Sequence, residues 1–155
     1  MSRWGAGEAT VERLLASGAL DVIGKSASDG AAVLAQAGRR LEVAEAALNI
    51  DPDAAYTNAY DAARLAATAL LIQQGLRPTT VGGHKAVEEA ILAQFGTGFS
   101  KFSMLRRRRH ELDYPDTSYT EATGREAQDA VGIARLFVTS ATKILPELGF
   151  FNDTE

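Results

Sequence analysis

The sequence contains no cysteine among its 155 residues, and this absence excludes disulfide frameworks, thiolate zinc sites and cysteine nucleophiles. Long apolar runs are missing as well. The longest uncharged run, from Leu65 to Leu76, has 12 residues and includes two glutamines, whereas a membrane-spanning helix needs roughly 20 apolar residues. The first residues also lack the apolar segment of a signal peptide. These absences predict a cytoplasmic protein with no membrane segment.

Proline is scarce too, with four residues against 28 alanines, so the composition favours helices. Prolines and glycines at the ends of apolar patterns divide the chain into helical segments, expected at residues 10–20, 28–49, 52–74, 83–95 and 99–112. A final helix is expected to begin after the capping-box pair Ser118 and Glu121 and to end before Pro146. Within residues 83–95, the apolar spacing predicts that Glu88 and Glu89 face outwards.

No segment alternates apolar and polar residues with a period of two, so no strand is predicted. We therefore expect an all-α protein, an antiparallel up-and-down bundle of four to five long helices at residues 26–150. A short helix and a linker at residues 1–25 precede it. The alanine-rich face of residues 52–74 and the mid-helix glycines Gly38 and Gly132 permit close helix approach, either within one chain or between two copies.

Positive charge is concentrated in one place. The net charge is −4, yet Lys101 and the run from Arg106 to Arg109 place five of the 16 basic residues within nine positions. A mildly acidic body with one cationic patch predicts a local anion site rather than a surface that coats nucleic acid.

The arginine run carries the residue types of metal-free phosphodiester cleavage. On a helix, Arg106, His110 and Asp113 share one face, and Arg109 lies one turn from Asp113. Arginine grips phosphate, histidine moves a proton near neutral pH, and a carboxylate orients the imidazole or accepts a proton. These three residues are the candidate catalytic set. The alternative is that some arginines are only solvated and that Arg109 and Asp113 form a plain surface ion pair.

A second polar stripe lies within residues 52–74, where Thr57, Asp61, Arg64 and Thr68 share a face. It is either part of a site or an exposed face on which Asp61 pairs with Arg64. His84 follows two glycines at the expected start of a helix, where an anion meets free backbone N–H groups. The nearby threonines and glycines do not form a phosphate-binding P-loop, and two histidines without cysteine predict neither a metal site nor a cofactor.

Three stretches together resemble the HEPN domain family over about residues 28–146. They are Tyr60 to Leu71, the loop Gly75-Leu76-Arg77-Pro78-Thr79 followed by Gly83-His84, and the arginine-rich helix that ends in Asp113-Tyr114. The resemblance implies a helical bundle that is commonly a homodimer. It also implies kinship with metal-independent ribonucleases, often toxins paired with a nucleotidyltransferase-like antitoxin. Further residues would then hold phosphate or RNA: Arg107, Arg108, Arg109, Tyr114, Asp61, Arg64 and His84.

The sequence departs from the nuclease signature of that family, which is an arginine, four to six intervening residues and a histidine. Arg106 and His110 have only three residues between them. If Arg108 is matched instead, the residue five positions on is Asp113, followed by Tyr114, as in a branch of the family in which the histidine is replaced.

Three hypotheses remain open. The first is a HEPN-type endoribonuclease of the toxin–antitoxin kind, with His110 as general acid or base and the arginines on the phosphate. The second is a module that binds nucleotide, RNA or an acidic partner without catalysis; it predicts that Asp113 is paired with arginine and that His110 faces solvent. The third is a structural helical subunit whose arginines keep it soluble.

Overall fold

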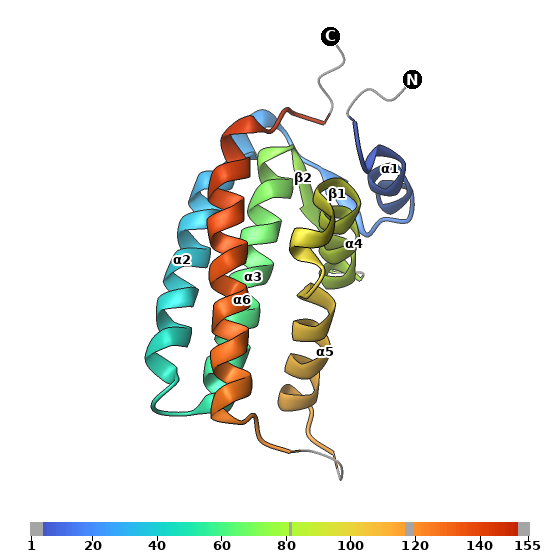
Figure 1. Ribbon diagram of the computed structural model, residues 1–155. Coiled ribbons are helices and arrows are strands. Elements are labelled where there is room, and N and C mark those ends of the chain that lie inside the picture. Colours follow the sequence, from blue (N-terminus) through green and yellow to red (C-terminus); the bar gives the residue numbers. More distant parts are fainter. Residues whose placement is uncertain (1–4, 81, 117–119, 152–155) are drawn as a thin grey trace.

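The computed structural model describes residues 5–80, 82–116 and 120–151. These residues form a helical bundle, as predicted, and Figure 1 shows its long helices side by side. The α-helices are α1 (Glu8–Ala16), α2 (Gly30–Ala47), α3 (Pro52–Gln73), α4 (Gly83–Phe95), α5 (Phe102–Asp113) and α6 (Gly124–Ile144). Three short 3₁₀ helices are η1 (Lys25–Ala27), η2 (Gly96–Phe99) and η3 (Leu145–Glu147).

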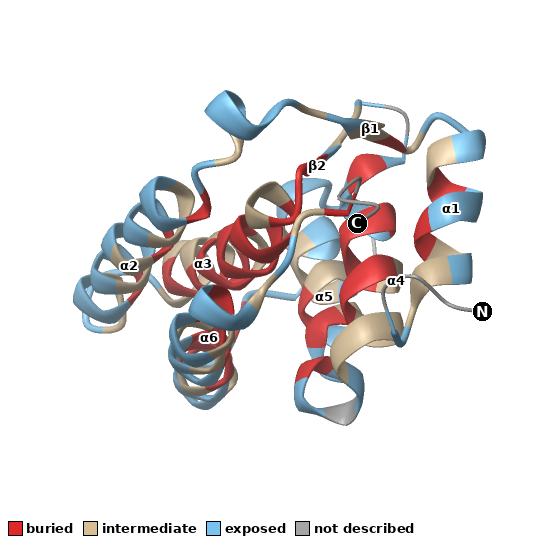
Figure 2. Ribbon diagram, turned by 90° about the horizontal axis from the view of Figure 1, so that it is seen from above, coloured by how far each residue is buried: buried red, intermediate tan, exposed pale blue. Residues whose placement is uncertain are grey.

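Helix α3 is the centre of the bundle. It begins as its sequence predicts, because the Asp51 side chain accepts a hydrogen bond from the Asp53 N–H and Pro52 occupies the first turn. Its many alanines let α2 and α6 pack closely on it, and α4 and α5 contact its other side. In Figure 2, α3 is almost entirely buried between these helices. The polar side chains of α3 therefore have other helices as neighbours.

An aromatic cluster joins α3, α5 and α6. The Phe137 ring meets those of Phe99 and Phe102 edge to face, with ring centroids 4.9 and 5.5 Å apart. Tyr60 of α3 completes the cluster, with its ring centroid 5.9 Å from that of Phe102. This packing fixes one side of α5 in the core and directs its arginines away from it.

Two helix starts differ from the predictions. Helix α6 begins at Gly124, since the capping box is formed by Thr123 and Glu126. The proposed cap Ser118 lies outside the described residues. Helix α5 begins at Phe102 rather than near residue 99, because η2 intervenes between α4 and α5.

A two-stranded antiparallel sheet, which the sequence did not predict, closes one end of the bundle. Strand β1 (Leu20–Val22) pairs with β2 (Leu76–Pro78), with Leu20 opposite Pro78 and Val22 opposite Leu76. Three residues are too short to produce a recognisable alternation. Gly75, at φ +83°, turns the chain from α3 into β2, and a Cβ at this position would lie 2.4 Å from the Phe150 ring.

Helix α1 packs against α4, on the side away from α2, α3 and α6 (Figure 2). The proposed division of the chain at residue 25 stays a prediction. Among the described residues, no helix has both the length and the apolar character needed to cross a membrane.

Candidate functional site

The arginine run lies on α5, whose buried side consists of Phe102 and Leu105. Because four consecutive helical residues point in four directions, the arginines reach different neighbours. Arg106, Arg108 and Arg109 each contact a carboxylate of another helix. Arg107 is exposed and has no ion pair or hydrogen bond among the described residues.

Arg106 pairs with Glu88 of α4, with 2.8 Å between Nε and Oε2. The prediction that Glu88 faces outwards is wrong, since the residue is only 9 % exposed. A carboxylate in such a place is costly unless a cation pairs with it, and Arg106 supplies that cation. One of the three candidate catalytic residues therefore joins α5 to α4.

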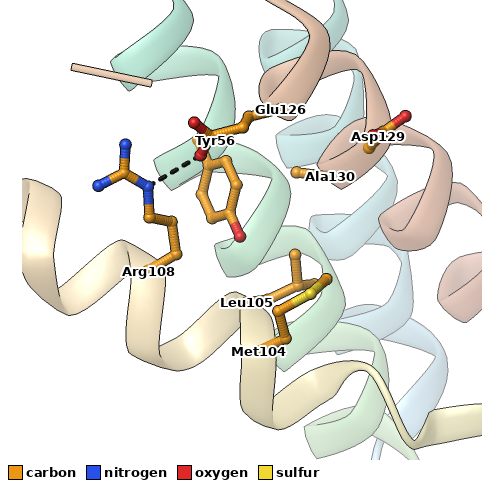
Figure 3. Close-up of a pocket in the computed structure, with 7 residues that line it drawn as sticks. All are labelled: Tyr56, Met104, Leu105, Arg108, Glu126, Asp129 and Ala130. Carbon is orange, nitrogen blue, oxygen red and sulfur yellow. Dashed lines mark hydrogen bonds and ion pairs between the residues drawn. The ribbon is translucent and has the colours of Figure 1, made fainter. Parts of the chain in front are cut away.

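Arg108 forms the most extensive set of contacts in the run. Figure 3 shows its Nε paired with Glu126 of α6, at 2.9 Å, above the ring of Tyr56. The same guanidinium donates to Glu111 at 3.1 Å and to the Thr120 carbonyl at 2.9 Å. The hydrogen bond to Glu126 is the main reason that the pKa of Arg108 is raised. With its side chain only 15 % exposed, Arg108 fastens α5 to α6 beside a small pocket of ≈ 260 Å³.

Arg109 lies between two carboxylates. Its Nε is 3.0 Å from Oδ2 of Asp113, and its Nη2 is 3.9 Å from Oδ1 of Asp61 on α3. The Nε–H is not aligned for a hydrogen bond, so the contact with Asp113 is electrostatic. The guanidinium also lies 5.5 Å from the centre of the Tyr60 ring. Asp61 has a second partner in Arg40 of α2, at 4.0 Å, and the expected pair of Asp61 with Arg64 is not found.

His110 is exposed, and its ring lies beside that of Tyr114, with centroids 4.8 Å apart. Tyr114 is itself 68 % exposed. The three candidate catalytic residues thus have separate partners: Glu88 for Arg106, Arg109 for Asp113 and Tyr114 for His110. The hypothesis of a binding module predicts that Asp113 is paired with arginine and that His110 faces solvent, and the structure has both features.

The polar stripe of α3 contains two groups without partners. Arg64 makes no ion pair or hydrogen bond with any described residue, and its Nε is completely buried. Thr68, one turn further along, is 8 % exposed and its hydroxyl likewise has no partner. A buried donor without an acceptor is destabilising, and in native proteins such a group calls for an explanation such as a bound ion or water.

His84, at the start of α4, contacts Tyr60 of α3. The Tyr60 hydroxyl lies 3.2 Å from Nδ1 of His84. Burial raises the pKa of Tyr60 to about 12, so this hydroxyl keeps its proton. Burial, followed by the charges of Arg64 and Arg109, lowers the pKa of His84 below 6.5. A neutral His84 that accepts from Tyr60 at Nδ1 carries its own proton on Nε2, which leaves one donor for a ligand.

Arg64 and His84 line an open pocket of ≈ 710 Å³ between α3, the start of α4 and the two-stranded sheet. We call this pocket the α3–α4 pocket. Its other lining residues are Asp21, Arg77, Pro78, Thr79, Thr80 and Gly83. Arg77 is 3.4 Å from Asp21 at the rim, and the Thr79 hydroxyl donates to the Gly18 carbonyl. The pocket thus presents one unpaired cation, Arg64, beside a neutral histidine.

The start of α4 adds backbone donors to this pocket. Its cap residue is Gly82, which offers no side chain to accept from the first turn. The N–H groups of Gly83, His84 and Lys85 have no acceptor among the described residues. Gly83 lies against Pro78, since a Cβ there would be 3.2 Å from the Pro78 Cβ.

Sequence reasoning singled out Arg64 and His84 but missed Tyr60, Arg77 and Thr80. Tyr60 and Arg77 appeared only within the stretches that resemble the family, and the sheet that brings Arg77 and Thr80 to α3 gave no sequence signal. No three His, Asp or Glu side chains of the described residues converge in a way that would hold a metal ion.

Comparison with known proteins gives one match. The description of the HEPN domain family fits residues 31–145, which is most of the chain. Searches among curated proteins and among solved structures found no significant match. Because this match covers most of the chain, the chain belongs to the HEPN domain family.

Proposed function

We propose that this HEPN protein binds the phosphate groups of RNA or of a nucleotide and does not cleave them. The observation that carries the proposal is the guanidinium of Arg64 at the wall of the α3–α4 pocket, which has a buried Nε and no partner among the described residues. Arginine presents a planar set of donors that matches phosphate, and the start of a helix adds backbone N–H groups that favour an anion. If Arg64 had only a structural role, we would expect a carboxylate of the protein to pair with its guanidinium.

The contacts on α5 favour binding over cleavage. Cleavage of RNA without a metal needs a base, an acid and a cation close to one phosphodiester. Arg106 is paired with Glu88 and Asp113 with Arg109, and the His110 ring lies beside that of Tyr114 at the surface. Arg107, which is exposed on α5, remains available as a second, weaker contact for RNA phosphates.

The partners implied by the family stay part of the proposal. A homodimer would bring two copies of α5 or of the α3–α4 pocket onto one RNA, and a nucleotidyltransferase-like antitoxin would cover one of these surfaces. Light scattering on the purified chain measures the first. Co-expression with a neighbouring nucleotidyltransferase, followed by co-purification, measures the second.

The test compares binding and cleavage in the same samples. Fluorescence anisotropy with a labelled RNA measures affinity at several salt concentrations, and a gel in EDTA measures cleavage. The proposal expects salt-sensitive binding, intact RNA and a loss of about 10- to 100-fold in affinity for Arg64→Gln, the range of a charge-assisted hydrogen bond pair. The matched control is Arg125→Gln, because Arg125 is an exposed arginine of α6 with no partner among the described residues.

Two results would overturn the proposal. Equal affinity of Arg64→Gln and the wild type would remove the α3–α4 pocket as the phosphate site. Cleavage in EDTA that disappears with His110→Ala, in a variant with an unchanged circular dichroism spectrum, would identify a metal-independent ribonuclease instead.

A further inference from the structure

We infer that the α3–α4 pocket takes a terminal phosphate, the phosphomonoester of a nucleotide or of an RNA end, in preference to the internal phosphodiesters of a chain. This inference rests on the proposed phosphate-binding function and names the substrate class of the same site. It is carried by the number and placement of the donors around the pocket, by the rim carboxylate and by the volume of the pocket.

The first argument concerns charge and donors. The pocket offers the guanidinium of Arg64, which has no partner among the described residues, the Thr80 hydroxyl, and the Nε2–H that His84 carries when its Nδ1 accepts from Tyr60. Next to them lie the first N–H groups of α4, for which no described residue is an acceptor. An internal phosphodiester has one charge and two non-bridging oxygens. A phosphomonoester has three such oxygens and a charge between about −1.5 and −2 at pH 7. The additional oxygen and charge are what this set of donors can satisfy.

The second argument concerns Asp21. Its carboxylate lies at the rim of the pocket, where it pairs with Arg77 at 3.4 Å. An internal phosphate of an RNA chain has a flanking phosphate on each side, and a flanking phosphate close to this carboxylate is repelled, because like charges repel. A terminal phosphate brings at most one. The same carboxylate is an acceptor for the hydroxyl groups of a ribose next to the bound phosphate.

The third argument is size. A volume of ≈ 710 Å³ lies within the range of small-molecule sites, roughly 300–1,000 Å³, and exceeds what a phosphate alone fills. Pro78 gives part of the wall an apolar surface against which a ribose or base can pack. The pocket therefore suits a whole nucleotide unit with its phosphate towards Arg64.

The experiment uses one RNA sequence in three forms, with a 5′-phosphate, with a 3′-phosphate or with hydroxyls at both ends, each labelled internally. Affinities are measured by anisotropy on the full chain. We expect at least one phosphorylated form to bind about tenfold more tightly than the form with two hydroxyl ends. A nucleoside monophosphate should displace it, whereas the nucleoside alone should not.

Variants of Arg64 test whether the preference for phosphorylated RNA ends comes from the α3–α4 pocket. Arg64→Gln should bind all three RNAs alike, and Arg64→Lys, which keeps the charge but not the planar donors, should retain part of the preference. Arg125→Gln should behave as the wild type. Circular dichroism and thermal unfolding verify that each variant is folded.

The outcomes separate the two proposals. Equal binding of the three RNAs by the wild type, weakened for all by Arg64→Gln, would leave the phosphate-binding function in place and overturn the terminal-phosphate inference. Displacement by inorganic phosphate as effective as that by the nucleotide would overturn the nucleotide part of it. No binding of any RNA or nucleotide would overturn both.

Discussion

Two glycines of α2 allow the packing of the bundle to be tested with one chemical change made twice. Gly30, the first residue of α2, faces α3: a Cβ there would lie 2.5 Å from the Ala69 carbonyl oxygen and 2.8 Å from the Gln73 Cβ. Neither atom can rotate away, because one is backbone and the other is the first atom of its side chain. The Gly30 N–H also donates to Oε1 of Gln73 at 3.2 Å. At Gly38 of the same helix, an added Cβ meets no atom within 4 Å.

Opposite effects on stability are therefore expected from the same substitution. Gly38→Ala gains about 0.5–1 kcal/mol, since alanine loses less entropy in a helix, and the melting temperature rises by roughly 2–4 °C per kcal/mol in a domain of this size. Gly30→Ala forces α2 away from α3, a change of the kind that costs about 1–3 kcal/mol, and Tm falls by roughly 2–12 °C.

Urea and thermal unfolding, followed by circular dichroism, measure both variants. A Gly30→Ala protein at least as stable as the wild type, with an unchanged urea dependence, would refute the close crossing of α2 and α3. Loss of stability in Gly38→Ala would show that something outside this chain covers that face. A second copy is the first candidate, and the dependence of Tm on protein concentration would identify it.

Three further predictions concern the caps and the site. Thr123→Ala removes the side-chain cap of α6 and should lower the free energy of unfolding by about 1 kcal/mol, measured in urea; no change would mean that the capping box is dispensable. Glu126→Gln keeps the shape but removes the charge opposite Arg108, a loss of about 1 kcal/mol for this partly buried pair, and an Arg108→Lys double-mutant cycle should give a coupling energy above zero. Titration of His84 by NMR should give a pKa below 6.5, because burial and the nearby arginines disfavour the imidazolium. Its unfolded pKa is about 6.5, so its contribution to stability is complete above that pH and is lost as the pH falls through the folded value; a pKa at or above 6.5 would contradict the environment described for His84.

The helices were predictable because capping residues, prolines and glycines near their ends determine where they begin and end. Asp51 and Pro52 start α3 where expected, and Gly75 ends it with a positive φ. The start of α6 was placed too early because Ser118 and Glu121 satisfy the same capping pattern as Thr123 and Glu126. Local patterns name the candidates for a cap, and the packing of the helix selects one.

The partners of the site residues were not predictable, since they come from other helices. The spacing of Arg109 and Asp113 gave their ion pair, which lies within one helix. Glu88 was expected at the surface because its own helix pattern placed it there, but Arg106, 18 residues away, pairs with it. Asp61 was expected to pair with Arg64 one turn away and instead faces Arg40 and Arg109. Because Asp61 faces Arg40 and Arg109, Arg64 is left without a carboxylate partner among the described residues.

The position of α3 in the sequence determines which helix contacts can form first during synthesis on the ribosome. Helices α2 and α3 are adjacent in the sequence and form the most extensive helix contact, so this hairpin can assemble as soon as residue 73 emerges. The hydrogen bond from the Phe151 N–H to the Gln74 carbonyl, at 2.8 Å, cannot form until residue 151 has emerged. At about 5–20 residues per second, that interval lasts roughly 4–16 s.

During this interval the central helix has not yet been covered by α6. Most of the residues that α3 finally buries are alanines, including Ala59, Ala63 and Ala67, and each exposes little apolar surface to water. The small side chains that let helices pack closely in the finished bundle thus also leave little exposed apolar surface on the incomplete chain. A central helix rich in leucine or phenylalanine would bury more apolar area at the end of synthesis, and it would leave that area open to aggregation until then.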